Sequence, residues 1–288
     1  MMSKYPTILE IIDWMENLAP QSFACDWDSV GLQIGYADRT VKRCLLALDF
    51  STDTWQYAKS RGYDFIIVHH PCLFNGTKTL IGTNPEQRIF LEAIQADISI
   101  YAAHTNLDSA PGGVNEALLD RLGFQSLQTL LPLPSEQIPE DYSTCNAKMI
   151  FPNLPESIVP GDLRLTIFET PRQAFDLIRH IQQTLSGPGY QVNSTENTAI
   201  KRLVVLGGAY DGHWNQTLVK HHVDFLLTGE IKYHDLLTLK AHHITAMSIG
   251  HDVSERVVLP YLQRGLSLAF PDARFEVYEG LEYNHITC

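Results

Sequence analysis

The chain has 288 residues, and its 21 Lys and Arg residues against 33 Asp and Glu residues give a formal net charge of −12 at pH 7. Hydrophobic residues make up 44% and charged residues 19%, a balance that excludes a disordered or low-complexity chain. The apolar runs are far shorter than the roughly 20 residues that a bilayer span needs, which argues against a membrane protein. The acidity argues against a nucleic-acid partner, because binding phosphates needs a surface rich in Lys and Arg.

Neither the first residues nor the cysteines indicate export. Residues 1–6 form no apolar signal segment, and the acidic residues Glu10, Asp13 and Glu16 argue against a transit peptide. The five cysteines are scattered and form no C-x-x-C pair, a pattern that predicts neither a disulfide framework nor a thiolate zinc site. We therefore expect a cytoplasmic protein.

Helical and strand-like segments alternate in the first part of the chain, as they do in parallel βαβ units. Apolar residues at helical spacing predict the helices, and short apolar runs predict the strands. In chain order the predicted segments are a helix at 7–18, a strand at 44–48, a helix at 51–61, a strand at 65–68, a helix at 84–95, a strand at 98–103 and a helix at 114–122.

Prolines crowd residues 131–162 and interrupt any regular period, so we predict a connector there. It separates a predicted first α/β domain, residues 1–130, from a predicted second α/β domain, residues 163–288. The regular alternation resumes with a strand at 163–168, a helix at 171–185 with Thr170 as its N-cap, and a strand at 200–206.

The later part of the chain repeats the earlier part. In the same order along the chain, residues 42–48 resemble 201–206, residues 63–68 resemble 223–228, and residues 98–104 resemble 244–251. The repeat favours two related α/β domains with mainly parallel sheets. Aligning the repeats places His70 on Glu230 and His104 on His251, so polar residues follow equivalent strands in both halves.

The carboxyl ends of parallel strands are where ligands bind in α/β sheets, and His and carboxylate residues gather at these ends. Two imidazoles just past a strand and before a proline, as in His69-His70-Pro71, can straddle a pair of divalent ions. A carboxylate can bridge two metals about 3.5–4 Å apart, the spacing that dinuclear hydrolases use. Asp108 follows His104 by four residues, as Glu255 follows His251, and such groups gathered at strand ends favour bound cations. Zinc, manganese, iron and nickel all suit His and carboxylate ligands.

Each of these residues also has an ordinary explanation. The pair His69-His70 could face solvent, Asp108 could cap a turn, and Glu255 could stabilise a helix N-terminus. Glu230 could act as an acid or base beside the metals, or it could simply begin a helix.

Five segments resemble, in order, the family of dinuclear metal proteins named after the NGG-interacting factor and often called GTP cyclohydrolase I type 2. The most specific is His-Thr-Asn-Leu-Asp followed by Pro-Gly-Gly-Val-Asn within residues 104–115. The others are the Asp-Trp-Asp-Ser-Val-Gly-Leu-Gln-Ile-Gly stretch at 26–35, His-His-Pro at 69–71, Thr-Gly-Glu-Ile-Lys at 228–232, and residues 250–255.

The resemblance implies two α/β domains that face each other across a two-metal site, in chains assembled as a homohexamer ring. The implied metal ligands are His69, His70, Asp108, His251 and Glu255. His104 would stand beside the metals as a proton donor or acceptor.

We therefore predict a dinuclear metal-dependent hydrolase, in which a metal-activated water attacks a small substrate such as a nucleotide or a cyclic amide. His104 or Glu230 would move the proton. The alternative is a noncatalytic metal-binding scaffold or interaction protein assembled as a ring.

Overall fold

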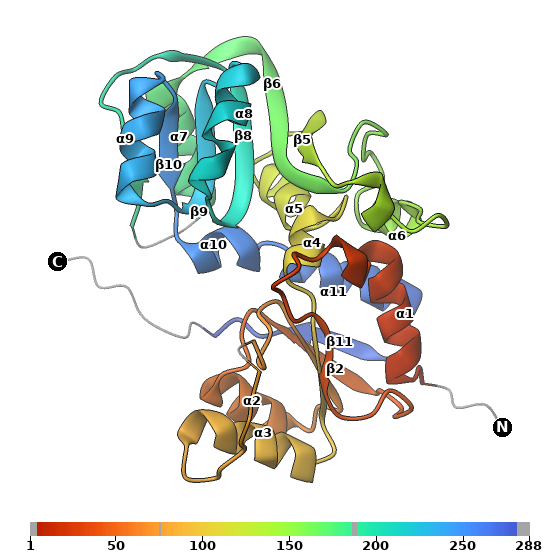
Figure 1. The fold of residues 1–288 in the computed structure, drawn as a ribbon. Helices are drawn as coiled ribbons and strands as arrows, with labels where there is room; N and C mark the ends of the chain where they lie inside the picture. Colours follow the sequence, from red (N-terminus) through yellow and green to blue (C-terminus); the bar gives the residue numbers. More distant parts are fainter. Residues whose placement is uncertain (1–4, 75, 186–188, 281–288) are drawn as a thin grey trace. The chain divides into compact units, whose positions relative to one another are not determined.

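The computed structural model describes residues 5–74, 76–185 and 189–280, which form two compact units (Figure 1). Of these residues, the first unit contains 5–107, 136–152 and 259–280. The second unit contains 108–135, 153–185 and 189–258. Each unit has its own β-sheet, and helices pack on the sheet in each case.

The first unit follows the predicted βαβ alternation. Its helices are α1 (Ile8–Leu18), η1 (Gln21–Phe23), α2 (Thr52–Arg61), α3 (Pro85–Gln95), α6 (Cys145–Ile150) and α11 (Leu259–Ala269). Its strands are β1 (Gly31–Ile34), β2 (Arg43–Ala47), β3 (Phe65–Val68), β4 (Ser99–Ala102) and β11 (Arg274–Val277). A short helix, α4 (Thr105–Ser109), follows β4.

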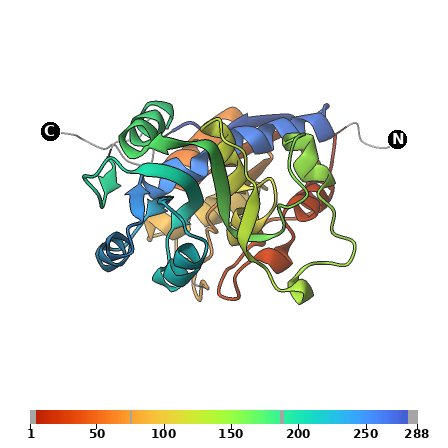
Figure 2. The same ribbon diagram turned by 90° about the horizontal axis from the view of Figure 1, so that it is seen from above.

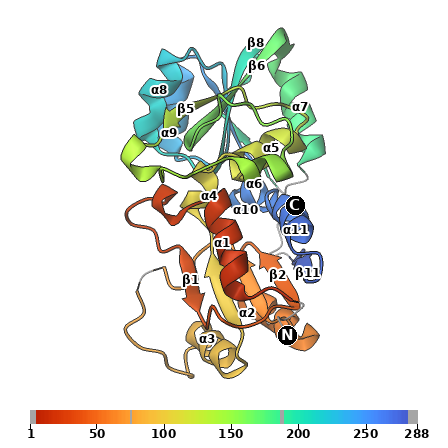
Figure 3. The same ribbon diagram turned by 90° about the vertical axis from the view of Figure 1, so that its right-hand side faces the viewer.

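The sheet of the first unit is parallel except at one edge. Its strand order is β1-β4-β3-β2-β11, in which β1 runs antiparallel to β4 and the other neighbours are parallel. Helices α2 and α3 cover one face of this sheet through a core that includes Trp55 and Phe90, and α1 and α11 lie on the opposite face (Figure 3). The strand β3 is therefore buried on both faces, as its continuous apolar run predicts.

Side chains cap the early helices at the residues where the predicted helices begin. Thr7 accepts a hydrogen bond from the N–H of Glu10 and forms a capping box with it at the start of α1. Ser51 caps α2, and Asn84 caps α3 ahead of Pro85. These helices are short, and no helix among the described residues is long and apolar enough to cross a membrane.

The second unit is also an α/β structure. Its helices are α5 (Val114–Arg121), α7 (Ala174–Thr184), η3 (Gly212–Trp214), α8 (Asn215–Lys220), α9 (Tyr233–Ala241) and α10 (His251–Arg256). Its strands are β5 (Gln128–Pro132), β6 (Gly161–Gln173), β7 (Gln191–Val192), β8 (Ala199–Ala209), β9 (Phe225–Glu230) and β10 (Thr245–Ser248). A further 3₁₀ helix, η2 (Ser135–Gln137), follows β5 along the chain.

The sheet of the second unit is mixed. Its order is β5-β6-β8-β9-β10-β7, and the central strands β8, β9 and β10 run parallel while the outer pairs run antiparallel. Helices α5, α7 and α10 pack on one face, whereas α8 and α9 pack on the other. Figure 2 shows α7 on one side of these strands and α8 and α9 on the opposite side. The predicted α/β class, with two related sheets, is confirmed.

The predicted helix at 171–185 begins three residues too early, and Thr170 is not its N-cap. The strand β6 runs on through Gln173, because Arg172 and Gln173 pair with the start of β8. The helix α7 then begins at Ala174, and its N-cap residue Gln173 makes no side-chain capping bond. Strand pairing with a distant segment overrides the local cap signal here.

The predicted sequence repeat corresponds to a repeated backbone arrangement. In the first unit, Oδ2 of Asp64 accepts hydrogen bonds from the N–H groups of residues 42 and 43, at 2.7 and 2.9 Å. In the second unit, Oδ2 of Asp224 accepts from the N–H groups of residues 201 and 202, both at 2.8 Å. We call each arrangement an aspartate clamp; each ties the residue just before one strand to the neighbouring parallel strand, at the end where their pairing begins.

The strand registers correct one detail of the predicted alignment. Ser99 pairs with the first residue of β3, and Thr245 pairs with the first residue of β9, so Ser99 and Thr245 are equivalent. Counting forward, His104 is equivalent to Gly250 and not to His251. Gly250 has a φ of +99°, a conformation that glycine adopts readily, and α10 begins immediately after it.

The compact units do not follow one another simply along the chain. Helix α11 and strand β11 come last in the sequence, yet β11 pairs in parallel with β2 at the edge of the first sheet. Residues 136–152, which include α6, also belong to the first unit. The predicted division into a first domain at 1–130, a connector at 131–162 and a second domain at 163–288 stays a prediction.

Candidate metal-binding site

His69 and His70 lie directly beyond the carboxyl end of β3. Their N–H groups bond to the carbonyl of Leu48 at 3.1 and 2.9 Å, which fixes the backbone beside the end of β2. His69 is 1% exposed, and the side chain of His70 is 25% exposed. The alternative of two solvent-facing histidines is therefore wrong for His69.

The imidazole rings of three histidines are oriented through Nδ1. Nδ1 of His69 lies 2.8 Å from the carbonyl oxygen of Ala103, which can only accept, so this nitrogen carries the proton. Nδ1 of His70 lies 2.8 Å from Oδ1 of Asp49. Nδ1 of His104 lies 3.0 Å from Oδ1 of Asp28 in the same way. Such contacts on one nitrogen fix the ring and make Nε2 the nitrogen suited to hold a metal.

The same three histidines, His69, His70 and His104, form a compact cluster in the first unit. One ring nitrogen from each lies within 4.8 Å of the others, and the ring centroids are 5.0–5.4 Å apart. Neutral imidazoles are ligands for zinc, iron, nickel and copper. The cluster therefore has the donor chemistry of a divalent metal site.

Asp28 is the partner of His104 and of the first residue of α4. Its side chain is fully buried, and its Oδ2 accepts hydrogen bonds from the N–H and the hydroxyl of Thr105, at 3.1 and 2.5 Å. Burial opposes ionisation of this carboxyl, but the bonds from His104 and Thr105 outweigh it and lower the pKa of Asp28 to about 2. Asp28 is thus a carboxylate at neutral pH.

Replacing Asp49 with alanine is expected to weaken metal binding. Asp49→Ala removes the carboxylate that lies 2.8 Å from Nδ1 of His70, and the side chain of Asp49 is 38% exposed. Loss of such an orienting partner typically weakens metal binding by about 10–100-fold. Titration with a competing chelator measures the affinity, with Asp53→Ala, an exposed carboxylate in the first turn of α2, as the control. Unchanged affinity in Asp49→Ala would show that Asp49 does not orient a ligand.

The second unit places His251 and Glu255 on one face of α10. Nε2 of His251 lies 3.1 Å from Oε1 of Glu255, and Glu255 is 1% exposed. The predicted spacing of one helical turn therefore brings the two side chains together. Glu230 ends β9 and does not begin a helix; its Oε2 lies 3.6 Å from Nδ1 of the same imidazole, and its side chain is 63% exposed.

Gly208 makes room for the carboxylate of Glu255. A Cβ atom at Gly208 would lie 2.4 Å from Oε1 of Glu255, and the φ of Gly208 is +69°. The N–H of Gly208 donates to the hydroxyl of Ser254 at 2.9 Å, which holds the strand end against α10. Gly208 therefore lets the end of β8 approach the carboxylate of Glu255 closely.

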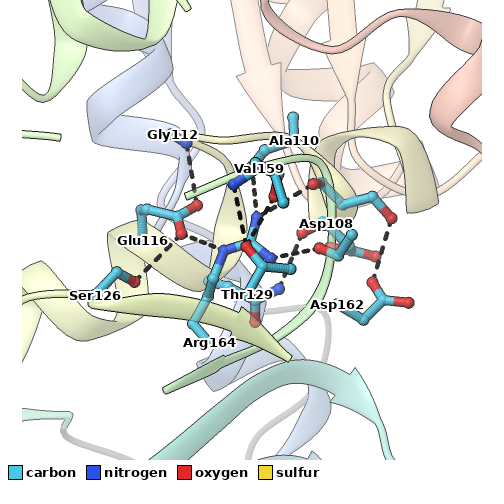
Figure 4. A network of polar contacts seen from close by, with 12 residues as sticks. Asp108, Ala110, Gly112, Glu116, Ser126, Thr129, Val159, Asp162 and Arg164 are labelled. Carbon is cyan, nitrogen blue, oxygen red and sulfur yellow. Dashed lines mark hydrogen bonds and ion pairs between the residues drawn. The ribbon is translucent and has the colours of Figure 1, made fainter. Parts of the chain in front are cut away.

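Asp108 lies on α4, followed by a turn that a buried arginine holds in place (Figure 4). Arg164 and Glu116 form an ion pair in which the two side chains are 0% and 4% exposed. Arg164 also donates through Nη2 to the carbonyls of Ser109 and Ala110, at 3.1 and 3.3 Å. The backbone directly after Asp108 is therefore fixed by a network within the second unit.

The network continues on both sides of the ion pair. Glu116 accepts from the N–H of Gly112 at 3.0 Å and from the hydroxyl of Ser126 at 3.3 Å. Asn115 donates to the carbonyl of Asp108 at 2.9 Å and accepts from the N–H of Gly207 at 2.9 Å. The motif at 104–115 thus has two parts. It places His104 and Asp108 after the end of β4, and it contains residues that fix the turn after Asp108.

A cavity of about 490 Å³ lies at the carboxyl ends of β8, β9 and β10 in the second unit. Its walls include Tyr190, Tyr210, Glu230, Lys232 and Ser248. Glu230 therefore faces a space large enough for a small molecule, at the edge of the sheet where parallel strands bind ligands.

Sequence reasoning placed the histidines and carboxylates at strand ends correctly, but it missed the residues that support them. These residues are Asp49, Glu116, Arg164 and Gly208. Asp49 had a usable signal, because it follows the predicted strand at 44–48 just as His69 follows the next strand. Cys72 is partly buried against the core, and burial raises the pKa of its thiol to about 12, so it is a packed thiol and not a thiolate ligand.

Comparisons with known proteins agree with this arrangement. The sequence profile of Duf34/NIF3 (NGG1p interacting factor 3) matches residues 6–281. A Clostridium perfringens protein named GTP cyclohydrolase 1 type 2 homolog is 28% identical over 250 residues, which cover 87% of both chains.

Two solved structures share the fold. The Staphylococcus aureus hypothetical protein SA1388 superposes with a TM-score of 0.84 and 27% identity, covering 97% of this chain and 99% of that one. The Bacillus cereus protein related to NIF3 gives a TM-score of 0.82 at 22% identity, covering 99% and 100%. With its profile match, its relatives and its strand-end histidines, the chain belongs to the Duf34/NIF3 family.

Proposed function

We propose that the protein is a metal-dependent hydrolase that acts on a small molecule. In this proposal two divalent ions are held by His69, His70, Asp108, His251 and Glu255. The observation that carries it is the cluster of imidazoles in the first unit, where one nitrogen from each of three rings lies within 4.8 Å of the others. The name of the Clostridium perfringens relative supports a hydrolytic reaction on a ring.

The residues fit divalent ions by their donor chemistry. The first unit offers imidazoles whose Nδ1 atoms are held by oxygen acceptors, and the second unit offers His251 with the buried carboxylate of Glu255. Burying a carboxylate beside imidazoles is costly without a compensating positive charge. Bound ions would supply that charge, polarise a substrate oxygen and lower the pKa of a bound water toward about 7.

His104 is placed to move a proton. Because the ionised carboxylate of Asp28 lies 3.0 Å from Nδ1, the imidazole is held in one orientation. Glu230 is a second candidate, since its exposed carboxylate lines the cavity of the second unit. We propose that the substrate is a nucleotide or a cyclic amide, that the chains assemble as a homohexamer ring, and that the protein works in the cytoplasm.

Metal analysis tests the proposal first. Protein purified without a His-tag should contain close to two divalent ions per chain, either as isolated or after reconstitution. The double variant His69→Ala/His70→Ala should lose metal, whereas His221→Ala/His222→Ala should not, because that adjacent pair follows α8 at the opposite edge of its sheet. Less than half an ion per chain in both the native and the reconstituted protein would refute a metal centre.

Turnover separates a hydrolase from a scaffold. Metal-loaded protein is assayed against nucleotides, phosphoesters and cyclic amides, and turnover by the wild type that disappears in His69→Ala/His70→Ala supports the enzyme. Full metal occupancy with no turnover of any class would favour the noncatalytic ring instead.

A further inference from the structure

Two exposed aromatic rings stand beside the histidine cluster of the first unit. Trp27 is 61% exposed and Phe74 is 45% exposed. Their ring centroids are 5.7 Å apart, and the rings meet edge to face at 66°. We call this pair the aromatic corner.

The aromatic corner contacts one member of the histidine cluster. The centroids of Trp27 and Phe74 lie 6.1 and 6.3 Å from that of His104, at interplanar angles of 71° and 74°. The ring of His104 in turn lies 5.2 Å from that of His69 and 5.4 Å from that of His70. Only the imidazole of His104 therefore separates a molecule held on the aromatic corner from His69 and His70.

The backbone presents Trp27 from an anchored turn. The N–H of Cys25 donates to the hydroxyl of Thr105 at 3.0 Å, and the N–H of Asp28 donates to the carbonyl of Cys25 at 2.9 Å. Asp28 itself is tied to Thr105 and His104. The backbone is therefore held at Cys25 and at Asp28, on either side of Trp27, and this loop conformation exposes the indole ring.

Phe74 is presented in a similar way from the turn after His-His-Pro. The two residues before it, Cys72 and Leu73, pack against the core of the first unit. The N–H of Leu73 donates to Oε1 of Gln33 at 3.4 Å, which ties this turn to β1. Phe74 therefore has a defined position next to Trp27.

Single exposed apolar residues are common on protein surfaces. Two large aromatic rings in mutual contact, both anchored and both touching a histidine of a candidate metal site, are less readily explained as ordinary surface. Exposed aromatic faces bind flat π-systems by stacking, and they do so largely independently of ring substituents. An aliphatic chain has no π-face for such stacking.

We propose that the aromatic corner binds the planar nitrogen heterocycle of the substrate, a ring of the nucleobase kind, and places it beside His104. The inference rests on the proposed function for its reaction, and it specifies the substrate class. Stacking on Trp27 and Phe74 supplies the affinity, and the imidazole of His104, held by Asp28, supplies a polar partner at the inner edge of the ring.

Equilibrium dialysis with guanosine, using ribose as the non-aromatic control, tests the assignment. Trp27→Ala and Phe74→Ala are each expected to weaken guanosine binding by about 5–150-fold, the range that loss of one base-stacking partner produces. Trp27→Phe retains an aromatic face and should recover most of the affinity. Tyr36→Ala is the matched control, because Tyr36 is 60% exposed in the same unit and has no ring contact with His104 among the described residues.

Metal content measured on the same samples keeps the two proposals distinguishable. Trp27→Ala should retain the metal of the wild type, because it removes no ligand atom. If the wild type holds no metal but binds guanosine in a Trp27-dependent way, the hydrolase proposal fails while the aromatic corner stands.

Three outcomes would overturn the aromatic corner. One is guanosine binding by Trp27→Ala and Phe74→Ala that equals the wild type, and another is ribose bound as tightly as guanosine. The third is a folded wild type that binds none of guanosine, adenosine and cytidine. A lower molecular mass of Trp27→Ala in light scattering, with unchanged guanosine binding, would assign the rings to a contact between copies of the chain.

Discussion

Replacing Glu255 with alanine is expected to lower the affinity of the protein for divalent metal by at least about 100-fold, more than the loss of an orienting partner does. Glu255 is 1% exposed, and its Oε1 lies 3.1 Å from Nε2 of His251. The surrounding backbone is shaped for this carboxylate, since a Cβ atom at Gly208 would stand 2.4 Å from the same oxygen. Isothermal titration of the apo protein with zinc or manganese measures the loss.

Glu230→Ala is the matched control for this effect. Its carboxylate faces the other nitrogen of the same imidazole, at 3.6 Å, but it is 63% exposed and is not a proposed ligand. Glu230→Ala should keep its metal while losing turnover, whereas Glu255→Ala should lose both. Wild-type metal affinity in a correctly folded Glu255→Ala protein would remove Glu255 from the ligand set.

Arg164→Met is expected to lower the free energy of unfolding by about 3–5 kcal/mol, because it leaves the carboxylate of Glu116 buried without its counter-charge. The two side chains are 0% and 4% exposed, so solvent cannot replace the lost partner. The carbonyls of Ser109 and Ala110 lose a donor as well. Denaturant unfolding followed by circular dichroism measures the change.

A second substitution separates the effect of the buried charge on Glu116 from the effect of Arg164 on the turn after Asp108. In Arg164→Met/Glu116→Gln the uncompensated charge is gone. The amide oxygen can still accept from the N–H of Gly112, and the amide NH2 can donate to the hydroxyl oxygen of Ser126. This double variant should recover about half or more of the lost stability. Its metal affinity should stay below that of the wild type, since the turn after Asp108 still lacks the donor that fixes it.

The opposite results would separate the two roles of Arg164. If Arg164→Met unfolds at wild-type denaturant concentrations, the ion pair contributes no net stability. If the double variant regains wild-type metal affinity together with its stability, Arg164 does not position Asp108.

Much of the first unit could be predicted because its signals are local. The strand at 65–68 is confirmed to the residue, and Ser51 and Asn84 cap the helices that the sequence predicts. Side-chain caps and apolar runs act within a few residues, so a sequence pattern contains them completely. The same locality explains why His69 and His70 could be assigned to a strand end.

What could not be predicted depends on partners that are distant in the sequence. β11 becomes a strand by pairing with β2, and β6 continues past Thr170 because β8 pairs with its last residues. Arg164 is an ordinary residue of a predicted strand until the fold brings it to Glu116. Its role as a buried cation follows from packing, which no local pattern records.

The aspartate clamps, at Asp64 and Asp224, separate strand pairing from site chemistry. Both lie at the amino ends of the strands, whereas the histidines and carboxylates of the candidate site lie at or beyond the carboxyl ends. Because the clamps hold neighbouring strands together at the opposite edge, side chains at the carboxyl ends can differ between the two units without loss of the strand pairing. The first unit has His70 at the position where the second unit has Glu230. The same sheet plan therefore presents different donor atoms in each unit.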